Sequence, residues 1–336
     1  MFRLLAALVC TMALLLTGAV AQTPEKDKVT VSIGTWVVGY LPLPLAKIKG
    51  YFKDQGMDVT IQNFDAGGSK ALQALVGGST DMVVGFYDHT LHMQTQGKEV
   101  RCVILLNVVP GFVVAVRKDL ESEITSAEQF KGRKIGVTAL GSGTEFMLRN
   151  LLKKAGLTAR DVTIVAVGSG PTSIAADERK SIDVTIAPDP AATILDKRNL
   201  IKLIIDARTI KGTTDVFGGL YPTTCLYMMD DFVTKNPVTV QRMVNSFART
   251  LEWMGSSTAA QIVDTLTPEY IIGEKGEFVQ MVDKSLPMFP KVGTFNLADL
   301  ERVREVISSF NDKVRDFKID MQRTYTNRFV EAAAKK

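Results

Sequence analysis

The chain has 336 residues, of which 46% are hydrophobic and 23% charged, and its formal net charge is +4. This composition excludes a disordered tail protein, a collagen-like repeat, a small disulfide-stapled scaffold and a multispanning membrane protein. The basic residues form no block, so the sequence argues against nucleic acid as a partner. Because single cores stop growing at roughly 250 to 300 residues, the length predicts two lobes.

The first 21 residues have the pattern of a cleavable export signal. Arg3 supplies a positive charge, residues 4–16 are apolar apart from Thr11, and small residues precede Gln22. This apolar run is shorter than the roughly 20 residues that span a bilayer. We therefore expect cleavage after Ala21 and an exported mature protein, with an uncleaved anchor as the alternative.

The three cysteines and two histidines form no recognisable metal site. Cys10 lies inside the apolar run, where it does not resemble a lipid-anchored cysteine. Cys102 and Cys225 would pair if their segments were neighbouring strands, but separate buried thiols are the expectation for a chain of this size. His89 and His92 add no zinc spacing and are expected on the surface or in a loop. The sequence therefore predicts neither a metal nor a cofactor.

Strands and helices alternate along the first two thirds of the chain, which predicts an α/β fold with mostly parallel sheets. In the first unit, hydrophobic patterning and turn residues predict strands at 29–33, 58–61, 81–84, 100–109 and 112–116, and helices at 42–51 and 70–76. The same rhythm restarts with strands at 132–137, 162–167, 182–186 and 200–205, and helices at 145–155 and from 191. One late strand, 226–229, precedes a mostly helical segment.

The late segment has to pack somewhere, and the simplest solution returns it to the first unit. The chain then crosses between lobes twice, near Phe112 to Lys118 and near Leu220 to Tyr227, which predicts a two-strand hinge beside a cleft. The expected division is a signal peptide at 1–21, a first lobe of 22–115 with 225–330, a second lobe of 116–224, and a flexible tail at 331–336.

Three glycine- and hydroxyl-rich loops follow predicted strands. They are Gly67-Gly68-Ser69, Gly141-Ser142-Gly143-Thr144 and Gly168-Ser169-Gly170-Pro171-Thr172. Ligands of open α/β sheets bind at such strand ends, where free N–H groups of the following helix attract anions. Helix caps without a ligand are the alternative interpretation. None of the loops has the spacing of a phosphate-cradling motif, so nucleotide binding is disfavoured.

Aromatic and acidic residues lie near the same strand ends. Trp36 and Tyr40 follow the first strand and are candidates for the cleft wall, whereas Phe86 and Phe112 are expected in the core. Asp88 and Asp189 could each meet a ligand cation, although capping of backbone N–H groups is the favoured role. No catalytic motif is present, so the sequence predicts a binding protein without catalytic residues.

Several segments together resemble the nitrate/sulfonate/taurine-type solute-binding proteins of ABC importers. The resemblance runs over roughly residues 28 to 320 and is carried by segments 46–59, 71–81, 130–137, 155–162 and 236–253 and by Asp189-Pro190. It implies a two-lobed type II periplasmic-binding-protein fold that closes on a small-molecule ligand. It also implies docking on membrane permease subunits. We expect the mature protein to be periplasmic and monomeric.

The resemblance also implies which residues line the cleft. They are Trp36, Tyr40, Gly68, Ser69, Asp88, Ser142, Gly143, Thr144 and Asp189. Many sulfonate-type members carry a tryptophan just before the Asp-Pro pair, where this chain has Pro188, so a simple alkanesulfonate is placed in doubt. No arginine lies in these loops, so an anion would rely on N–H groups, hydroxyls and Lys70.

The favoured hypothesis is therefore capture of a small organic anion, a sulfonate or carboxylate. The second hypothesis is a heterocycle, such as a pyrimidine vitamin precursor, held by the aromatic residues and the two aspartates. An enzyme of the same fold is less favoured because the chain carries an export pattern. A sensor or chemoreceptor subunit is a further alternative.

Overall fold

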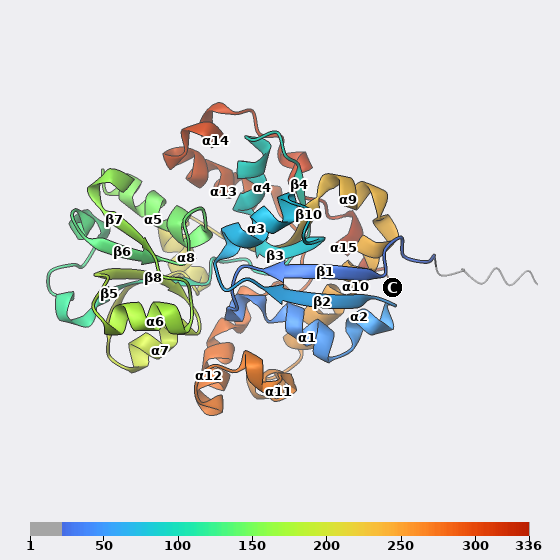
Figure 1. Cartoon of the computed structure of the whole chain (residues 1–336), viewed down its shortest axis with the longest axis horizontal. Coiled ribbons are helices and arrows are strands. Elements are labelled where there is room, and N and C mark those ends of the chain that lie inside the picture. The colour runs from blue at the N-terminus through green and yellow to red at the C-terminus, as the bar shows by residue number, and fades with distance from the viewer. Residues whose placement is uncertain (1–21, 336) are drawn as a thin grey trace, which may run out of the picture.

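The structure is a computed structural model that describes residues 22–335, so the predicted signal peptide lies outside the described residues. Two sheets form two lobes (Figure 1). The first sheet has the order β2-β1-β3-β10-β4, and the second has the order β7-β6-β8-β5-β9. In each sheet the fourth strand runs antiparallel to its neighbours, so the two lobes share one topology.

The strands of the first sheet are β1 (Lys28–Ile33), β2 (Asp58–Asn63), β3 (Met82–Phe86), β4 (Val100–Leu105) and β10 (Thr224–Met229). Those of the second are β5 (Phe112–Arg117), β6 (Lys134–Val137), β7 (Thr163–Ala166), β8 (Val184–Pro188) and β9 (Ile201–Asp206). The central strands β3 and β8 are buried along their whole length, as strands covered by helices on both faces must be.

Helices cover both sheets. The first lobe carries α1 (Pro42–Ile48), α2 (Tyr51–Asp54), α3 (Gly68–Val76), α4 (Asp88–Gln94) and the late helices α9 (Asp230–Lys235), α10 (Pro237–Gly255), α11 (Ala259–Thr265), α12 (Lys275–Ser285), α13 (Leu297–Phe310), α14 (Asp312–Asp316) and α15 (Arg328–Ala333). The second lobe carries α5 (Gly143–Lys154), α6 (Pro171–Glu178), α7 (Ala191–Lys197) and α8 (Ile210–Phe217). Within residues 22–335 no helix is long and apolar enough to cross a membrane.

The late segment returns to the first lobe, as the sequence predicts, but the crossings lie earlier than predicted. All of Phe112–Arg117 belongs to the second sheet, so the predicted boundary between residues 115 and 116 falls inside β5. The connecting segments are residues 106–111 and 218–223, which hydrogen-bond to each other through Thr223 N and Asn107 O at 3.1 Å. The continuous apolar run 112–116 predicts a strand without indicating which sheet it joins, which explains the misplaced boundary.

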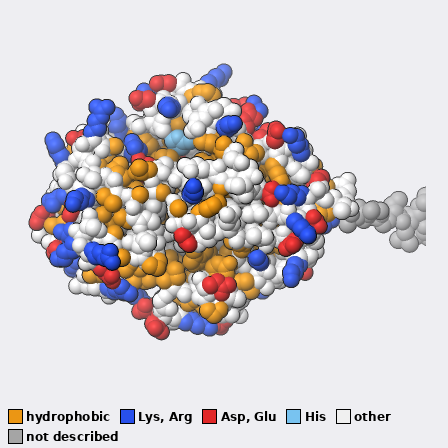
Figure 2. All heavy atoms as spheres, in the orientation of Figure 1, with side chains coloured by type: hydrophobic (Ala, Val, Ile, Leu, Met, Phe, Trp, Pro, Cys, Tyr) orange, Lys and Arg blue, Asp and Glu red, His pale blue; other side chains and the backbone are white. Residues whose placement is uncertain are grey.

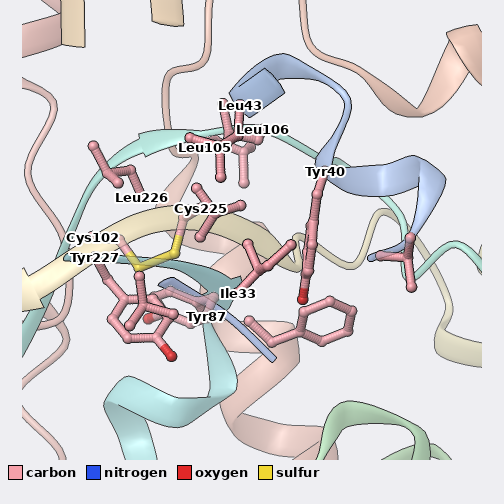
Figure 3. Close-up of a cluster of buried hydrophobic side chains, with 14 of the residues drawn as sticks. Ile33, Tyr40, Leu43, Tyr87, Cys102, Leu105, Leu106, Cys225, Leu226 and Tyr227 are labelled. Carbon is pink, nitrogen blue, oxygen red and sulfur yellow. A yellow bond between two sulfur atoms is a disulfide. The ribbon is translucent and has the colours of Figure 1, made fainter. Parts of the chain in front are cut away.

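Two further expectations are wrong. Cys102 and Cys225 form a disulfide because β4 and β10 are neighbouring strands, with the two Cα atoms 5.9 Å apart (Figure 3). Residues 331–333 are not a flexible tail but the last turn of α15, which is anchored by buried Phe329 and Val330.

On the face shown in Figure 2, acidic and basic side chains are interspersed.

Candidate functional site

A cavity lies between the two lobes and is lined by residues of both. Its volume is about 40 Å³, which is space for roughly three or four water molecules. Its lining comprises Thr35, Val37, Val38, Gly39, Tyr40, Gly68, Phe86, His89, Asn107, Pro110, Gly111, Phe112, Thr138, Ser142, Gly143, Thr144, Pro188, Asp189, Thr224 and Met288.

The second lobe contributes three hydroxyl groups at the start of α5. Thr138 follows β6, and its Oγ1 lies 2.9 Å from Ser142 Oγ and 2.9 Å from Thr144 Oγ1. Ser142 Oγ and Thr144 Oγ1 are themselves 2.9 Å apart, so the three oxygens form a triangle. We call these three side chains the hydroxyl triangle. They lie where the first N–H groups of a 12-residue helix point, a place that favours negative charge.

Gly143 in this turn has a packing reason to be glycine. A Cβ atom built there would lie 2.4 Å from Cδ2 of Phe86, which belongs to the other lobe. Phe86 stacks on Phe112 with ring centroids 5.3 Å apart. Both rings are largely buried, as predicted, and both also line the cavity. The two lobes therefore meet tightly around the predicted loop 141–144.

Asp189 is the only carboxylate that lines the cavity in the described part of the chain, and its charge is compensated. Arg208 Nη1 donates to both Asp189 oxygens at 3.1 and 3.3 Å, and Thr193 N donates to Asp189 Oδ1 at 2.9 Å. Arg208 also holds Asp206 at 2.6 Å. The predicted capping role of Asp189 is therefore present, but Arg208 was missed because it follows a different strand, β9.

Direct contacts join the lobes beside the cavity. Thr35 Oγ1 of the first lobe lies 2.6 Å from Ser169 Oγ of the second. Val38 N donates to the carbonyl of Asp189 at 3.1 Å. Ser169 belongs to the third predicted glycine- and hydroxyl-rich loop, which here contacts the opposite lobe.

Six of the nine predicted site residues line the cavity, namely Tyr40, Gly68, Ser142, Gly143, Thr144 and Asp189. The other three do not. Trp36 packs edge-on against Tyr270 and donates to its carbonyl at 3.1 Å. Ser69 lines a neighbouring groove, and Asp88 is buried behind the cavity wall. Lys70 is exposed and lies outside the cavity lining.

Burial dominates the electrostatics around Asp88 and His89. Burial raises the pKa of Asp88 to about 7, with a backbone hydrogen bond at His89 acting in the opposite direction. Burial lowers the pKa of His89 to about 3, so this imidazole is neutral at ordinary pH. The acid–base groups of the cavity lining are thus the neutral imidazole of His89, the paired carboxylate of Asp189 and the phenol of Tyr40, whose pKa burial raises further.

Several lining residues were not predicted. Thr138 could have been found as the residue that directly follows a strand, but Thr35, Asn107 and Met288 carry no local signal. Asn107 enters the lining because it lies in the crossing segment, and its Nδ2 is buried without a hydrogen-bond partner among residues 22–335. His89 was expected in a loop or on the surface, but it lies on α4 with 2% exposure.

Solved structures share this architecture. A protein of Bordetella bronchiseptica RB50 is 36% identical, with a TM-score of 0.88 over 94% of this chain and 99% of that one. The alkanesulfonate-binding protein SsuA from Xanthomonas axonopodis pv. citri, solved with MOPS bound, is 17% identical, with a TM-score of 0.70 over 91% of this chain and 100% of that one. The predicted two-lobed type II periplasmic-binding-protein fold is thereby confirmed.

Sequence comparison identifies the family. A 4-amino-5-hydroxymethyl-2-methylpyrimidine phosphate synthase of Aspergillus parasiticus is 25% identical over 313 residues, which cover 90% of this chain and 87% of the synthase. The family model described as NMT1/THI5 like matches residues 39–257, a range that runs through both lobes. Because this match extends through both lobes, the chain belongs to the NMT1/THI5-like family.

Proposed function

We propose that this protein is the solute-binding component of an ABC importer and that it captures a small organic anion, a sulfonate or a carboxylate, between its lobes. It acts in the periplasm and delivers the ligand to permease subunits without transforming it. The export-signal pattern of residues 1–21 supports this location. The likeness in fold to an alkanesulfonate-binding protein supports the ligand class.

The observation that carries the proposal is the hydroxyl triangle at the start of α5. A single helix terminus stabilises an anion by only about 0.3 to 2 kcal/mol, so further donors are needed for useful affinity. Thr144 Oγ1 accepts from Thr138 N at 2.9 Å, so its own proton can turn toward a bound oxygen. Ser142 Oγ donates to the Ala139 carbonyl at 2.7 Å and would exchange that bond for one to the ligand. Hydrogen bonds to a charged group contribute about 1.5 to 3 kcal/mol each.

The acid–base groups of the cavity support binding rather than catalysis. Asp189 has both oxygens engaged by Arg208, so it is not available as a general base. His89 is held neutral by burial, and its Nδ1 lies 2.9 Å from the Tyr227 hydroxyl on β10. Neither group is paired with a nucleophile in the cavity lining.

A heterocycle is the second candidate ligand. The relative named as a pyrimidine phosphate synthase aligns along most of the chain, and the cavity has flat aromatic walls in Tyr40, Phe86 and Phe112. A planar ring between these walls would leave the hydroxyl triangle free to bind ring substituents. The two candidates differ in charge, which makes them separable by experiment.

The test is a ligand panel measured by thermal shift and then by isothermal titration calorimetry. The panel contains alkyl and aromatic sulfonates, small carboxylates, and neutral aminopyrimidines. We expect a sulfonate or carboxylate to bind, and Thr144→Val, which keeps the shape of the side chain, to weaken its binding by about 10- to 100-fold, the cost of one hydrogen bond to a charged group.

Ser181→Ala is the matched control, because it removes an exposed hydroxyl of the same lobe outside the cavity. Its affinity should equal that of the wild type. Binding of the pyrimidines alone would replace the first candidate with the second. A new product in a mass-resolved incubation with the bound ligand would overturn the proposal that the protein performs no chemistry.

A further inference from the structure

The chain has two histidines, and both lie where the lobes meet, on helix α4 of the first lobe. The ring of His89 packs beside Gly68, where a built Cβ would lie 3.2 Å from its Cε1, and it faces the Gly141 backbone of the second lobe. The ring of His92 stacks on Phe146 of α5 with centroids 4.5 Å apart. Each imidazole therefore contacts the opposite lobe.

Both imidazoles are built into this junction in their neutral form. The Nε2 atoms of His89 and His92 are buried and have no hydrogen-bond partner among residues 22–335. The Tyr227 hydroxyl lies 2.9 Å from Nδ1 of His89, and an imidazolium would restrict this hydroxyl to accepting, because both ring nitrogens would then be donors. An imidazolium at either position would place an uncompensated charge in a desolvated site.

Within residues 22–335, the charged groups near the two imidazoles do not offer an imidazolium a free counter-ion. Glu145 of α5 faces His92, but it is bound to Arg149 at 2.6 Å. Asp312 and Lys313 line the same groove with opposite charges. Asp88 directly precedes His89, and burial keeps it protonated at acidic pH. The titratable and charged groups around the two imidazoles are thus Asp88, Glu145, Arg149, Tyr227, Asp312 and Lys313.

We propose that separation of the lobes is coupled to protonation of His89 and His92, so that acid favours the open form and release of the ligand. Release of the ligand rests on the proposed function, whereas the coupling of lobe separation to protonation does not require a ligand. When the lobes separate, the second-lobe groups Gly141 and Phe146 leave the two rings, which then reach water. Lowered pKa values of about 3 for His89 and about 4 for His92, caused first by burial, agree with this geometry.

The size of the effect follows from the ordinary pKa of histidine, about 6.5. At pH 5.5 a hydrated imidazole is protonated roughly ten to one, so each histidine shifts the equilibrium toward the open form by about 10-fold. Two histidines acting independently would shift it by about 100-fold between pH 7.5 and pH 5.5. This shift changes the average shape strongly when the open and closed forms have comparable populations at pH 7.5.

The experiment uses the purified chain without added ligand. Small-angle X-ray scattering at pH 7.5 and pH 5.5 measures the radius of gyration, and circular dichroism confirms that the chain stays folded. Imidazole carbon NMR follows both histidines over the same range. We expect the radius to increase at pH 5.5 as both imidazoles titrate. His92→Phe, which keeps the stack on Phe146, should reduce the shift about 10-fold, and adding His89→Asn should abolish it.

Asp88→Asn is the control for the neighbouring carboxyl, and it should keep the acid response. Two results would overturn the inference: imidazoles that titrate while the radius stays constant, or an opening that persists in the double variant. Failure of the ligand panel would leave both measurements valid, so this inference and the proposed function can fail separately.

Discussion

Each lobe has an aspartate after the equivalent strand of the shared topology, but the two carboxyl groups have different surroundings. Strands β3 and β8 are each third in the order of their sheet, and a short helix follows each of them. Asp88 is the first residue of α4 after β3, and Asp189 directly follows β8. Both side chains are at least 95% buried.

The surroundings of the two carboxylates differ. Asp189 accepts from Arg208 and from Thr193 N, so both of its oxygens are satisfied. Asp88 has one oxygen, Oδ1, that is buried and has no hydrogen-bond partner in the described part of the chain. A buried carboxylate without a counter-ion is neutralised by a proton. The second lobe therefore has an ion pair at this position, and the first has a buried carboxyl whose pKa burial raises to about 7.

Removing the compensating cation should have the largest effect. Arg208→Met keeps the length and apolar stem of the side chain but leaves Asp189 and Asp206 without their partner. Breaking a buried pair on one side costs about 3 to 5 kcal/mol, because a charge stays buried and uncompensated. We expect a loss of this size in the free energy of unfolding, measured by urea denaturation at pH 7.5.

Arg198→Ala is the control for Arg208→Met in the same lobe. Arg198 pairs with Glu178 at 2.6 Å, but both side chains are largely exposed, and such pairs contribute at most about 1 kcal/mol. Equal losses from the two substitutions would mean that Asp189 relaxes into water when Arg208 is removed, and the contrast with Asp88 would then disappear.

The first lobe has a covalent cross-link in addition to the backbone pairing that both lobes share at this position. Strands β4 and β10 are paired by their backbones and joined by the Cys102–Cys225 disulfide, whereas the matching strands β9 and β5 are paired by their backbones. The disulfide closes a loop with a sequence separation of 123, and disulfides typically stabilise by about 2 to 4 kcal/mol. We expect the Cys102→Ala/Cys225→Ala variant to lose about this much stability in urea denaturation.

The reducing agent supplies the control for this variant. Dithiothreitol should lower the stability of the wild-type chain during unfolding and leave the alanine variant unchanged. If the wild type and the variant unfold at the same urea concentration without reductant, the cross-link does not contribute to the stability of the first lobe.

Local patterns predicted the parts of the site that depend on local structure. A strand followed by glycine, hydroxyl residues and an amphipathic helix placed Ser142, Gly143 and Thr144 correctly at a helix start in the cavity. The alternation of strands and helices likewise predicted the two lobes and the return of the last third of the chain. These features need only neighbours in sequence.

Features that depend on long-range neighbours were missed. Arg208 reaches Asp189 because β9 and β8 flank β5, and Cys102 meets Cys225 because β10 runs beside β4. His89 is buried only because the Gly68 and Gly141 turns of both lobes close over α4. A single sequence contains no signal for strand order, so the partners of these side chains could not be read from it.

Asp88→Asn should give an effect that vanishes at acidic pH, and its sign tests the contrast between the two aspartates directly. Burial raises the pKa of Asp88 to about 7 from an ordinary value of 3.8, so between these values the folded chain holds a proton that the unfolded chain lacks. The free energy of unfolding therefore falls as the pH rises from about 4 to 7. Asparagine carries no titrating proton, so the variant should be no more stable than the wild type at pH 4.5 and more stable at pH 8, by about 3 kcal/mol at roughly 1.4 kcal/mol per pKa unit.

The measurement is urea denaturation of both proteins at pH 4.5, 6 and 8. His89 and His92 act in the opposite direction, because burial lowers their pKa values to about 3 and about 4. Their contribution to the free energy of unfolding therefore rises with pH up to about 6.5. Both proteins contain these histidines, so their contribution cancels in the difference between variant and wild type. A difference that stays constant with pH would show that Asp88 is already ionised in the folded chain, and that the two lobes treat their aspartates alike.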